Sequence, residues 1–188
     1  MSRLFLIVGN SGSGKDSLIW EVQKNFPKDM KSIKVPKRVI TRPPSPETED
    51  FESADESTFL KIKEKGGFAL DWHIYNLYYG VRKNIEEWLA EGHPVLINVS
   101  RKIIDMARDR YPDLRVIFVK VPYEITAQRI KERGRENEEK MKARLERARK
   151  NQDFPSADFT VDNSGDLETA GQILMDYIIS EVKQAEKQ

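Results

Sequence analysis

The sequence predicts an α/β fold with a central parallel sheet, and three observations support this prediction. Residues 4–8, LFLIV, form a continuous aliphatic run, which is typical of a strand buried on both faces. From Lys15 the apolar residues recur at helical spacing until Pro27 ends the pattern. Strand-like and helix-like segments then alternate along the chain, as expected of parallel strands joined by right-handed crossovers.

The later elements follow the same alternation. We expect further strands at 35–40, 94–99, 114–121 and 159–161. We expect further helices at 55–65 (with Asp55 as N-cap), 83–91, 101–111, 123–133, 137–151 and 167–183. Residues 41–50 contain three prolines and three acidic residues, which predicts an extended surface loop.

Length and composition favour a single domain that spans residues 1–188. A chain of 188 residues, 38% of them hydrophobic, is close to the size at which one core forms efficiently. The 32 Lys and Arg residues balance the 31 Asp and Glu residues, so no global charge draws the chain to nucleic acid. The longest apolar run is far shorter than the roughly 20 residues of a membrane span. The chain has no cysteine, and we expect a cytoplasmic protein with neither a nucleic-acid nor a membrane partner.

Residues 9–15, GNSGSGK, match the phosphate-binding loop G-x-x-x-x-G-K between a predicted strand and a predicted helix. Glycines in such a loop let successive main-chain N–H groups turn toward a phosphate, and the helix N-terminus adds partial positive charge. The lysine supplies a mobile charge for the outer phosphates. The predicted nucleotide-binding residues are Gly9, Asn10, Ser11, Gly12, Ser13, Gly14, Lys15, Asp16 and Ser17.

One position departs from this pattern. Asp16 follows the lysine where a Mg²⁺-ligating Ser or Thr is usual, and Ser17 comes next. The predicted strand at 94–99 ends at Asn98 without the acidic residue that often holds the metal in P-loop enzymes. Our hypothesis is that Asp16 supplies the missing carboxylate, directly or through a water, and that Asp16 and Ser17 form the metal site.

The loop alone does not distinguish a kinase from a GTPase or a motor, but the chain lacks a guanine-binding motif of the GTPases. A small kinase needs an acceptor pocket and a cationic cover, because phosphoryl transfer depends on positioning and charge neutralisation. Residues 128–150 include ten Lys or Arg among 23 residues and would suit such a cover. The alternative is a solvated helix face with i,i+4 ion pairs.

The chain resembles the guanylate-kinase-like P-loop kinases over nearly its whole length. Besides the phosphate loop, the resemblance rests on VITRP at 39–43, FALDW at 68–72, LYYG at 77–80 and RIKERGRE at 129–136 followed by Arg144. It implies a three-layer P-loop NTPase fold with an acceptor region at about 34–82 and a helical lid at about 128–150. It also implies that Arg129, Arg133 and Arg144 act with Lys15 as the catalytic cations, and that residues 162–163 lie near the adenine.

The acceptor region departs from the guanylate kinase pattern where guanine is read. Leu70 stands at the position of the base-binding glutamate, Ser45 at that of a phosphate-binding arginine, and Phe51 at that of a phosphate-binding tyrosine. The strand end at Asn98 also lacks acidic residues. Unpaired polar groups discriminate strongly between ligands, so a site without these readers is not suited to a purine.

These departures match the ribose 1,5-bisphosphate phosphokinases, which the chain resembles from residue 4 to about 165. The matching segments are GSGKDS at 12–17, TRP at 41–43, LYYGV at 77–81, VLINVSR at 95–101 and RGREN at 133–137. This resemblance implies ATP and Mg²⁺ as cofactors, ribose 1,5-bisphosphate as small-molecule substrate, 5-phosphoribosyl 1-diphosphate as product and a place in phosphonate metabolism. The alternatives are a guanylate or other nucleoside-monophosphate kinase, and a non-catalytic binding module.

A sugar with two phosphates calls for cations and hydroxyls in the acceptor site. On this resemblance the candidate substrate-binding residues are Arg38, Arg42, Tyr79, Arg82 and Arg101. Gly80 directly after Tyr79 suggests a close approach of the backbone to a ligand. The sequence does not indicate an oligomeric state.

Overall fold

The structure of the chain is a computed structural model that describes residues 3–44, 50–133 and 138–187, with the side chains of Arg133 and Lys140 left outside. Four parallel strands form the main sheet in the order β6-β1-β7-β8. Their bounds are β1 (Leu4–Gly9), β6 (Val95–Asn98), β7 (Arg115–Lys120) and β8 (Phe159–Asp162). This sheet confirms the predicted fold class.

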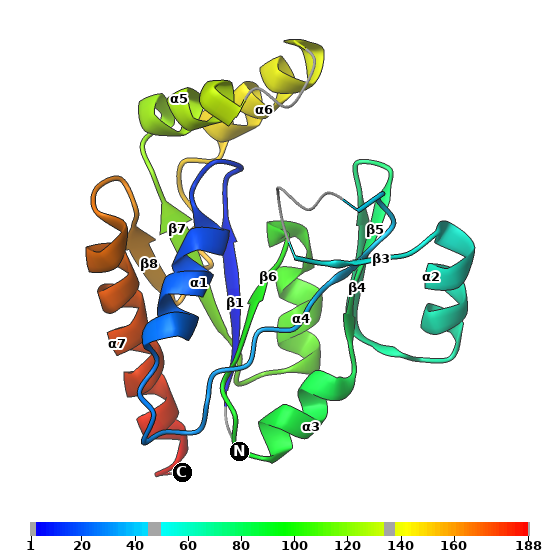
Figure 1. Cartoon of the computed structure of the whole chain (residues 1–188), viewed down its shortest axis with the longest axis vertical. Helices are drawn as coiled ribbons and strands as arrows, with labels where there is room; N and C mark the ends of the chain where they lie inside the picture. Colours follow the sequence, from blue (N-terminus) through cyan, green and yellow to red (C-terminus); the bar gives the residue numbers. More distant parts are fainter. Residues whose placement is uncertain (1–2, 45–49, 134–137, 188) are drawn as a thin grey trace.

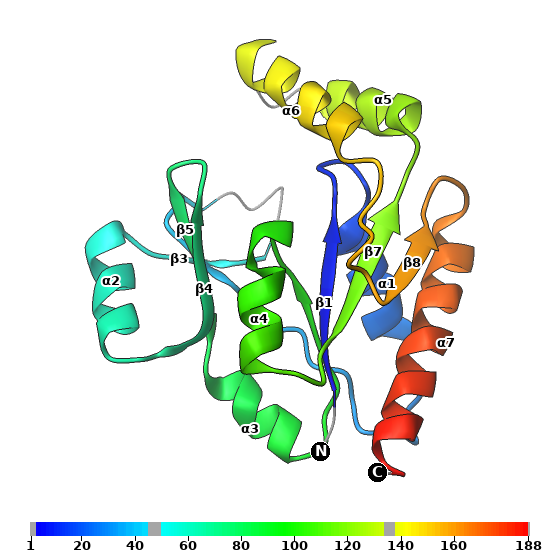
Figure 2. The ribbon, with the colours of Figure 1, turned by 180° about the vertical axis from the view of Figure 1, so that it is seen from behind.

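Helices cover both faces of the main sheet (Figures 1 and 2). The helices are α1 (Lys15–Asn25), α2 (Glu56–Glu64), α3 (Asn84–Ala90), α4 (Ile104–Arg110), α5 (Tyr123–Arg133), α6 (Glu138–Lys150) and α7 (Leu167–Ala185). Phe5 and Ile7 of β1 pack with α1 and α7, whereas Leu6 and Val8 pack with α3 and α4. Successive side chains of a strand point to opposite faces, so a continuous apolar run is what a doubly covered strand requires.

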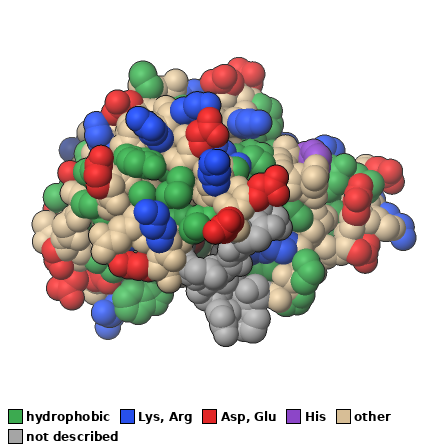
Figure 3. Space-filling view, turned by 90° about the horizontal axis from the view of Figure 1, so that it is seen from above, with side chains coloured by type: hydrophobic (Ala, Val, Ile, Leu, Met, Phe, Trp, Pro, Cys, Tyr) green, Lys and Arg blue, Asp and Glu red, His purple; other side chains and the backbone are tan. Residues whose placement is uncertain are grey.

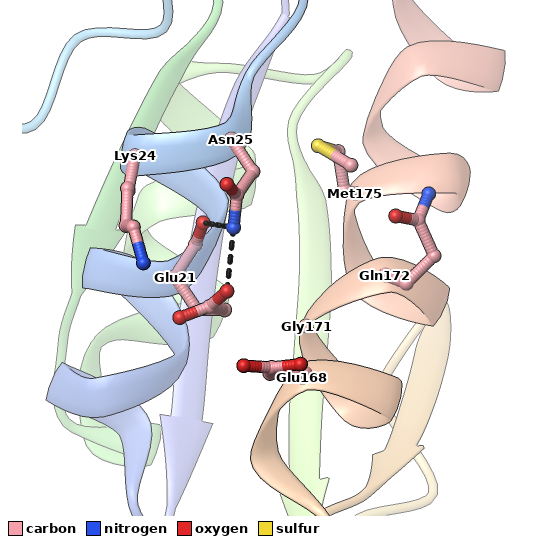
Figure 4. A pocket seen from close by; sticks show the side chains of 7 residues that line it. All are labelled: Glu21, Lys24, Asn25, Glu168, Gly171, Gln172 and Met175. Carbon is pink, nitrogen blue, oxygen red and sulfur yellow. Dashed lines mark hydrogen bonds between the residues drawn. The ribbon is translucent and has the colours of Figure 1, made fainter.

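Helices α1 and α7 lie side by side on one face of the main sheet (Figure 4). A Cβ atom at Gly171 would lie 2.7 Å from Cγ of Glu21, so the absence of a side chain permits this approach. Glu21 is buried and its carboxylate accepts a hydrogen bond from Asn25. The groove between the two helices encloses about 240 Å³ and also contacts Lys24 and Met175.

A second, mixed sheet of order β3-β2-β5-β4 lies beside the main sheet. It contains β2 (Val39–Ile40), β3 (Glu52–Ser53), β4 (Phe68–Ile74) and β5 (Leu77–Arg82). The sequence did not predict the β4-β5 hairpin. Its turn residues, Tyr75 and Asn76, have φ angles of 53° and 60°, as a two-residue type I′ turn requires, but they lack the glycine that normally signals it.

Two predicted elements differ in detail from the structure. The strand expected at 35–40 is confined to residues 39–40, which form β2 of the second sheet, and Lys34, just before the expected range, makes an isolated bridge to Val95 of the main sheet. The helix expected at 101–111 begins as the 3₁₀ turn Arg101–Ile103 before α4. Residues 41–44 are neither helix nor strand, as predicted for the proline-rich loop, and 45–49, including Ser45, lie outside the described residues.

Helices α5 and α6 pack against each other above the end of the main sheet where β1 stops (Figure 1). We call this pair the lid.

Asp55 caps α2 as predicted, since its Oδ1 accepts the Thr58 N–H at 2.7 Å. In the described part of the chain, no helix is long and apolar enough to span a bilayer.

Gly80 is required by packing inside the protein, a reason for the glycine other than the ligand contact expected from the sequence. A Cβ at this position would lie 2.5 Å from the ring of Phe68, which itself stacks on Phe59 of α2. The absence of a side chain at Gly80 therefore lets the ring of Phe68 pack against β5 in the core of the second sheet.

We expect Gly80→Ala to lower the free energy of unfolding by about 1–3 kcal/mol, because the methyl group overpacks the ring of Phe68. Urea denaturation measures the change. Gly165→Ala is the control, since a Cβ there has no neighbour within 4 Å. Equal stabilities of the two variants would contradict the assigned role of Gly80.

Candidate active site

The phosphate loop connects β1 to α1 at the carboxyl end of the main sheet. Gly12 and Gly14 have φ angles of 85° and 82°, a region that side-chain-bearing residues seldom adopt. The Ser13 N–H donates to the carbonyl of Asn10 at 3.1 Å, which closes a tight turn. Main-chain N–H groups arranged in this way before a helix form an anion-binding concavity.

Asn163, directly after β8, braces this loop with its side-chain amide. Its Nδ2 donates to the Ser13 carbonyl at 2.8 Å, and its side chain is buried. A Cβ at Gly14 would lie 2.4 Å from this amide nitrogen. The carbonyl of Asn163 also accepts hydrogen bonds from both terminal nitrogens of Arg129, each at 3.2 Å. Asn163 therefore links the loop to the lid, a role that the sequence did not reveal.

Lys15 extends back over the loop from the first turn of α1. Its Nζ donates to the carbonyls of Gly9 and Asn10 at 3.0 and 2.9 Å. The side chain is half-buried. These two hydrogen bonds hold the ammonium group against the carbonyls of the loop.

Asp16 connects the phosphate loop to the end of β6. Its Oδ1 accepts a hydrogen bond from Nδ2 of Asn98 at 2.8 Å, and the carbonyl of Asn98 accepts one from Arg38 at 3.0 Å. Burial lowers the pKa of the Arg38 guanidinium, while the nearby carboxylate of Asp16 acts in the opposite direction. The carboxylate therefore lies beside the strand end that lacks an acidic residue.

Three predicted substrate-binding residues lie together near this strand end. Both Arg42 and Tyr79 act on the pKa of the Arg38 guanidinium. Tyr79 raises this pKa, whereas Arg42 lowers it by repulsion. The guanidinium of Arg42 lies 4.5 Å from the ring centre of Phe51, and Tyr79 stacks on Trp72 with ring centres 5.2 Å apart. We call Arg38, Arg42 and Tyr79 the acceptor cluster.

The other two predicted substrate-binding residues, Arg82 and Arg101, are hydrogen-bonded to protein groups. Arg82 makes two hydrogen bonds to the carboxylate of Glu52, one of them at 3.0 Å, which joins β5 to β3 and raises the pKa of the guanidinium. Arg101 contacts the side chain of Asn10 and the carbonyl of Asn151. Both guanidinium groups thus have protein partners, a feature that their spacing in the sequence could not indicate.

Two predicted arginines of the lid are half-buried, whereas an ion pair on α6 is exposed to solvent. Arg129 and Arg144 are half-buried, whereas the side chain of Arg133 lies outside the described residues. On the outer face Lys150 donates to Glu146 at 2.8 Å. Viewed from above, Lys and Arg side chains are interspersed with Asp and Glu (Figure 3). The solvated helix face with an i,i+4 ion pair is therefore present on α6, and the cationic cover stays a prediction.

The lid also contacts the tip of the β4-β5 hairpin. The guanidinium of Arg147 lies 4.4 Å from the ring centre of Tyr75, a residue that is 60% exposed. This cation–π contact joins the second sheet to α6 across the site. Neither residue was predicted from the sequence, since nothing in the local pattern marks a contact between such distant segments.

A cavity of about 340 Å³ opens beside the phosphate loop under α5. It is lined by Gly12, Gly14, Ser17, Arg129, Glu132, Asn163, Gly165 and Leu167. Its volume is within the range of small-molecule sites. The cavity adjoins the loop on the side of α7, whereas the acceptor cluster adjoins it on the side of the second sheet.

The site has the features of a P-loop kinase, namely a phosphate loop between β1 and α1 of a parallel sheet and a helical lid above it. The model of the guanylate kinase family matches residues 1–181. The chain is 37% identical over 180 residues to ribose 1,5-bisphosphate phosphokinase PhnN of Pseudomonas paraeruginosa, covering 94% of this chain and 95% of that protein. The protein of the same name from Azotobacter vinelandii is 39% identical over 77% of this chain and 78% of its own length. The chain belongs to the guanylate kinase family and, within it, to the ribose 1,5-bisphosphate phosphokinases.

Solved structures show the same fold. Guanylate kinase from Anaplasma phagocytophilum has a TM-score of 0.69 at 17% identity, covering 96% of this chain and 86% of its own. A gluconokinase from Sinorhizobium meliloti has a TM-score of 0.54 at 14% identity, covering 100% and 97% of the two chains. These likenesses support the kinase fold.

We expect Asn163→Ala to lower the free energy of unfolding by about 1–3 kcal/mol, because the buried carbonyl of Ser13 loses its donor. Urea denaturation of the variant measures the loss. Gln172→Ala is the control, since this residue is exposed on α7 and its change is expected to stay within about 0.5 kcal/mol. A loss no greater than that of the control would show that Asn163 does not brace the loop.

Proposed function

We propose that this chain transfers the γ-phosphoryl group of ATP to the 1-phosphate of ribose 1,5-bisphosphate, which gives 5-phosphoribosyl 1-diphosphate and ADP. The observation that carries the proposal is the identity of 35–39% to relatives named for this substrate, together with an acceptor side that has arginines but no base reader. Leu70, at the position of the guanine-binding glutamate, is 1% exposed and packs in the main core.

The donor nucleotide would bind the phosphate loop. Its phosphates suit the main-chain N–H groups of residues 9–17, with the ammonium of Lys15 directed to the outer phosphates. Arg129 reaches the loop through Asn163 and would stabilise the charge of the transferred group together with Arg133 and Arg144. The cavity beside Asn163 has space for part of the nucleoside. Lid and loop would thus enclose the triphosphate and exclude water.

Asp16 and Ser17 are the residues that would hold Mg²⁺. Both are exposed in the first turn of α1, and Asn98 fixes the carboxylate of Asp16 on the side of the acceptor cluster. The described residues include no group of three or more His, Cys, Asp or Glu suited to a metal. This donor set fits Mg²⁺, which keeps several waters and binds through one or two protein oxygens plus substrate phosphates. When bound, the ion supplies neutralisation of the charge on the β- and γ-phosphate oxygens.

The acceptor cluster would bind the sugar bisphosphate. Arg38 and Arg42 supply two cations for an anion with two phosphates, and Tyr79 supplies a hydroxyl donor. Arg38 is anchored to the carbonyl of Asn98, so one cation is held directly beside Asp16 and the phosphate loop. This position brings the acceptor phosphate toward the end of the donor triphosphate. The other two predicted substrate-binding residues, Arg82 and Arg101, are hydrogen-bonded to Glu52 and to Asn10.

The reaction needs no general base. An ionised oxygen of the 1-phosphate attacks the γ-phosphorus of ATP, a new P–O bond forms, and the bond from the γ-phosphorus to the bridging β,γ-oxygen breaks as ADP leaves. No proton must be removed, because a phosphate monoester is largely ionised near neutral pH. The contribution of the protein is positioning and charge stabilisation by Lys15 and the arginines of the two sides.

We expect rapid release of ADP with ATP, Mg²⁺ and ribose 1,5-bisphosphate, and a kcat/KM for GMP lower by about 10⁴-fold or more, because guanine finds no polar partner at Leu70. A coupled ADP assay and ³¹P NMR of the new diphosphate measure this. Lys15→Ala is the inactive control. Faster turnover of GMP would identify a nucleoside-monophosphate kinase, and no turnover with any acceptor would favour a non-catalytic binding module.

We expect Asp16→Ser to reduce kcat by about 10–100-fold and to raise the Mg²⁺ concentration needed for half-maximal rate, because the metal site loses its carboxylate. Titration of Mg²⁺ at saturating ATP measures both effects. Asp105→Ser is the matched control, since Asp105 is an exposed carboxylate on α4. Full turnover with an unchanged Mg²⁺ dependence would remove Asp16 from the metal site.

A further inference from the structure

The C-terminal end of α6 is attached to the phosphate loop through one side chain. Nδ2 of Asn10 donates to the carbonyls of Ala148 and Asn151, at 3.2 and 2.9 Å. The last carbonyls of a helix have no partner inside the helix, so they need donors from elsewhere. Asn10 supplies such a donor from 138 and 141 residues away in the sequence.

Arg101 completes this contact from a third segment. Its Nη1 donates to Oδ1 of Asn10 at 3.1 Å, and its Nη2 donates to the carbonyl of Asn151 at 3.3 Å. The guanidinium lies 5.0 and 5.8 Å from the ring centres of Phe118 and Phe154. Burial lowers the pKa of this guanidinium. We call Asn10, Arg101 and Asn151 the latch.

The partners of Asn10 determine the orientation of its amide. Its oxygen must accept from a guanidinium that has only donors, and its nitrogen must donate to carbonyls that are only acceptors. An amide is therefore the side chain that satisfies all these groups at once. An aspartate of the same shape would direct a carboxylate oxygen at the helix carbonyls.

The backbone of Asn10 belongs to the phosphate loop itself. Its carbonyl accepts the Ser13 N–H at 3.1 Å and Nζ of Lys15 at 2.9 Å. The side chain of this residue thus holds the base of the lid, while its main chain shapes the turn and holds the ammonium group. A shift of the end of α6 relative to the loop would therefore displace both the turn at Ser13 and the ammonium group of Lys15.

We propose that the latch sets the position of α6 relative to the phosphate loop and that Asn10 and Arg101 are positioning residues for phosphoryl transfer. Arg101 then acts through Asn10 on the lid and on Lys15, and does not bind the acceptor sugar. The kinetic part of this inference rests on the proposed function, whereas the structural part concerns the attachment of α6.

The test compares Asn10→Ala, Arg101→Met and the double variant in the full chain. We expect each single variant to lower kcat about 10-fold or more and to raise KM for ATP, with KM for ribose 1,5-bisphosphate changed less than about 2-fold. Because both residues act through one latch, the double variant is expected to resemble the more affected single variant. Arg101→Lys restores one donor and should recover part of the activity. Arg110→Met, which removes the ion pair between Arg110 of α4 and Glu86 of α3, is the matched control.

Hydrogen–deuterium exchange gives a readout that does not depend on catalysis. Amides of 141–150 in α6 should exchange at least about 5-fold faster in Asn10→Ala and Arg101→Met than in the unmodified chain and in the Arg110→Met control. If the unmodified chain turns over no sugar bisphosphate, the proposed function fails while this exchange result still decides the latch. Unchanged exchange in α6 overturns the latch. A rise of KM for ribose 1,5-bisphosphate alone in Arg101→Met would instead identify Arg101 as an acceptor ligand.

Discussion

The rest of the site depends on the main-chain path of the phosphate loop. Gly14 adopts a positive φ angle where a Cβ would contact Asn163, and the amide of Asn163 holds the carbonyl of Ser13. N–H groups can converge on a phosphate only while this path is kept. The loop is therefore held by the main sheet on one side, through β8, and by the lid on the other, through Asn10.

Charge is distributed around this loop in a way that suits two anionic ligands. Cations approach from the lid and from the second sheet, whereas Asp16 is the carboxylate that joins the loop to the end of β6. Asn98, a neutral residue at that strand end, orients both Asp16 and Arg38. Because the carboxylate is on α1 and not at the end of β6, the acceptor side remains free for cations, as a sugar with two phosphates requires.

The lid is held by three contacts of two kinds. Half-buried side chains form the hydrogen bonds on the loop side: Arg129 of α5 bonds to Asn163, and Asn10 bonds to the end of α6. An exposed cation–π contact connects Arg147 to Tyr75 at the tip of the hairpin. Exposed contacts of this type are worth only about 0.5–1 kcal/mol. The contact at the hairpin tip therefore adds little to the stability of the lid.

The sequence by itself determined the alternating α/β pattern, the phosphate loop and the presence of Leu70 at the position of the guanine-binding glutamate, because each depends on residues that are close together in the chain. Tertiary structure alone decided which partners the predicted arginines have. Arg82 is held by Glu52 and Arg101 by Asn10, and the hairpin turn at Tyr75 has no local signal. A polar side chain takes the partner that the fold brings within about 3 Å, and that partner can be a hundred residues away in the chain.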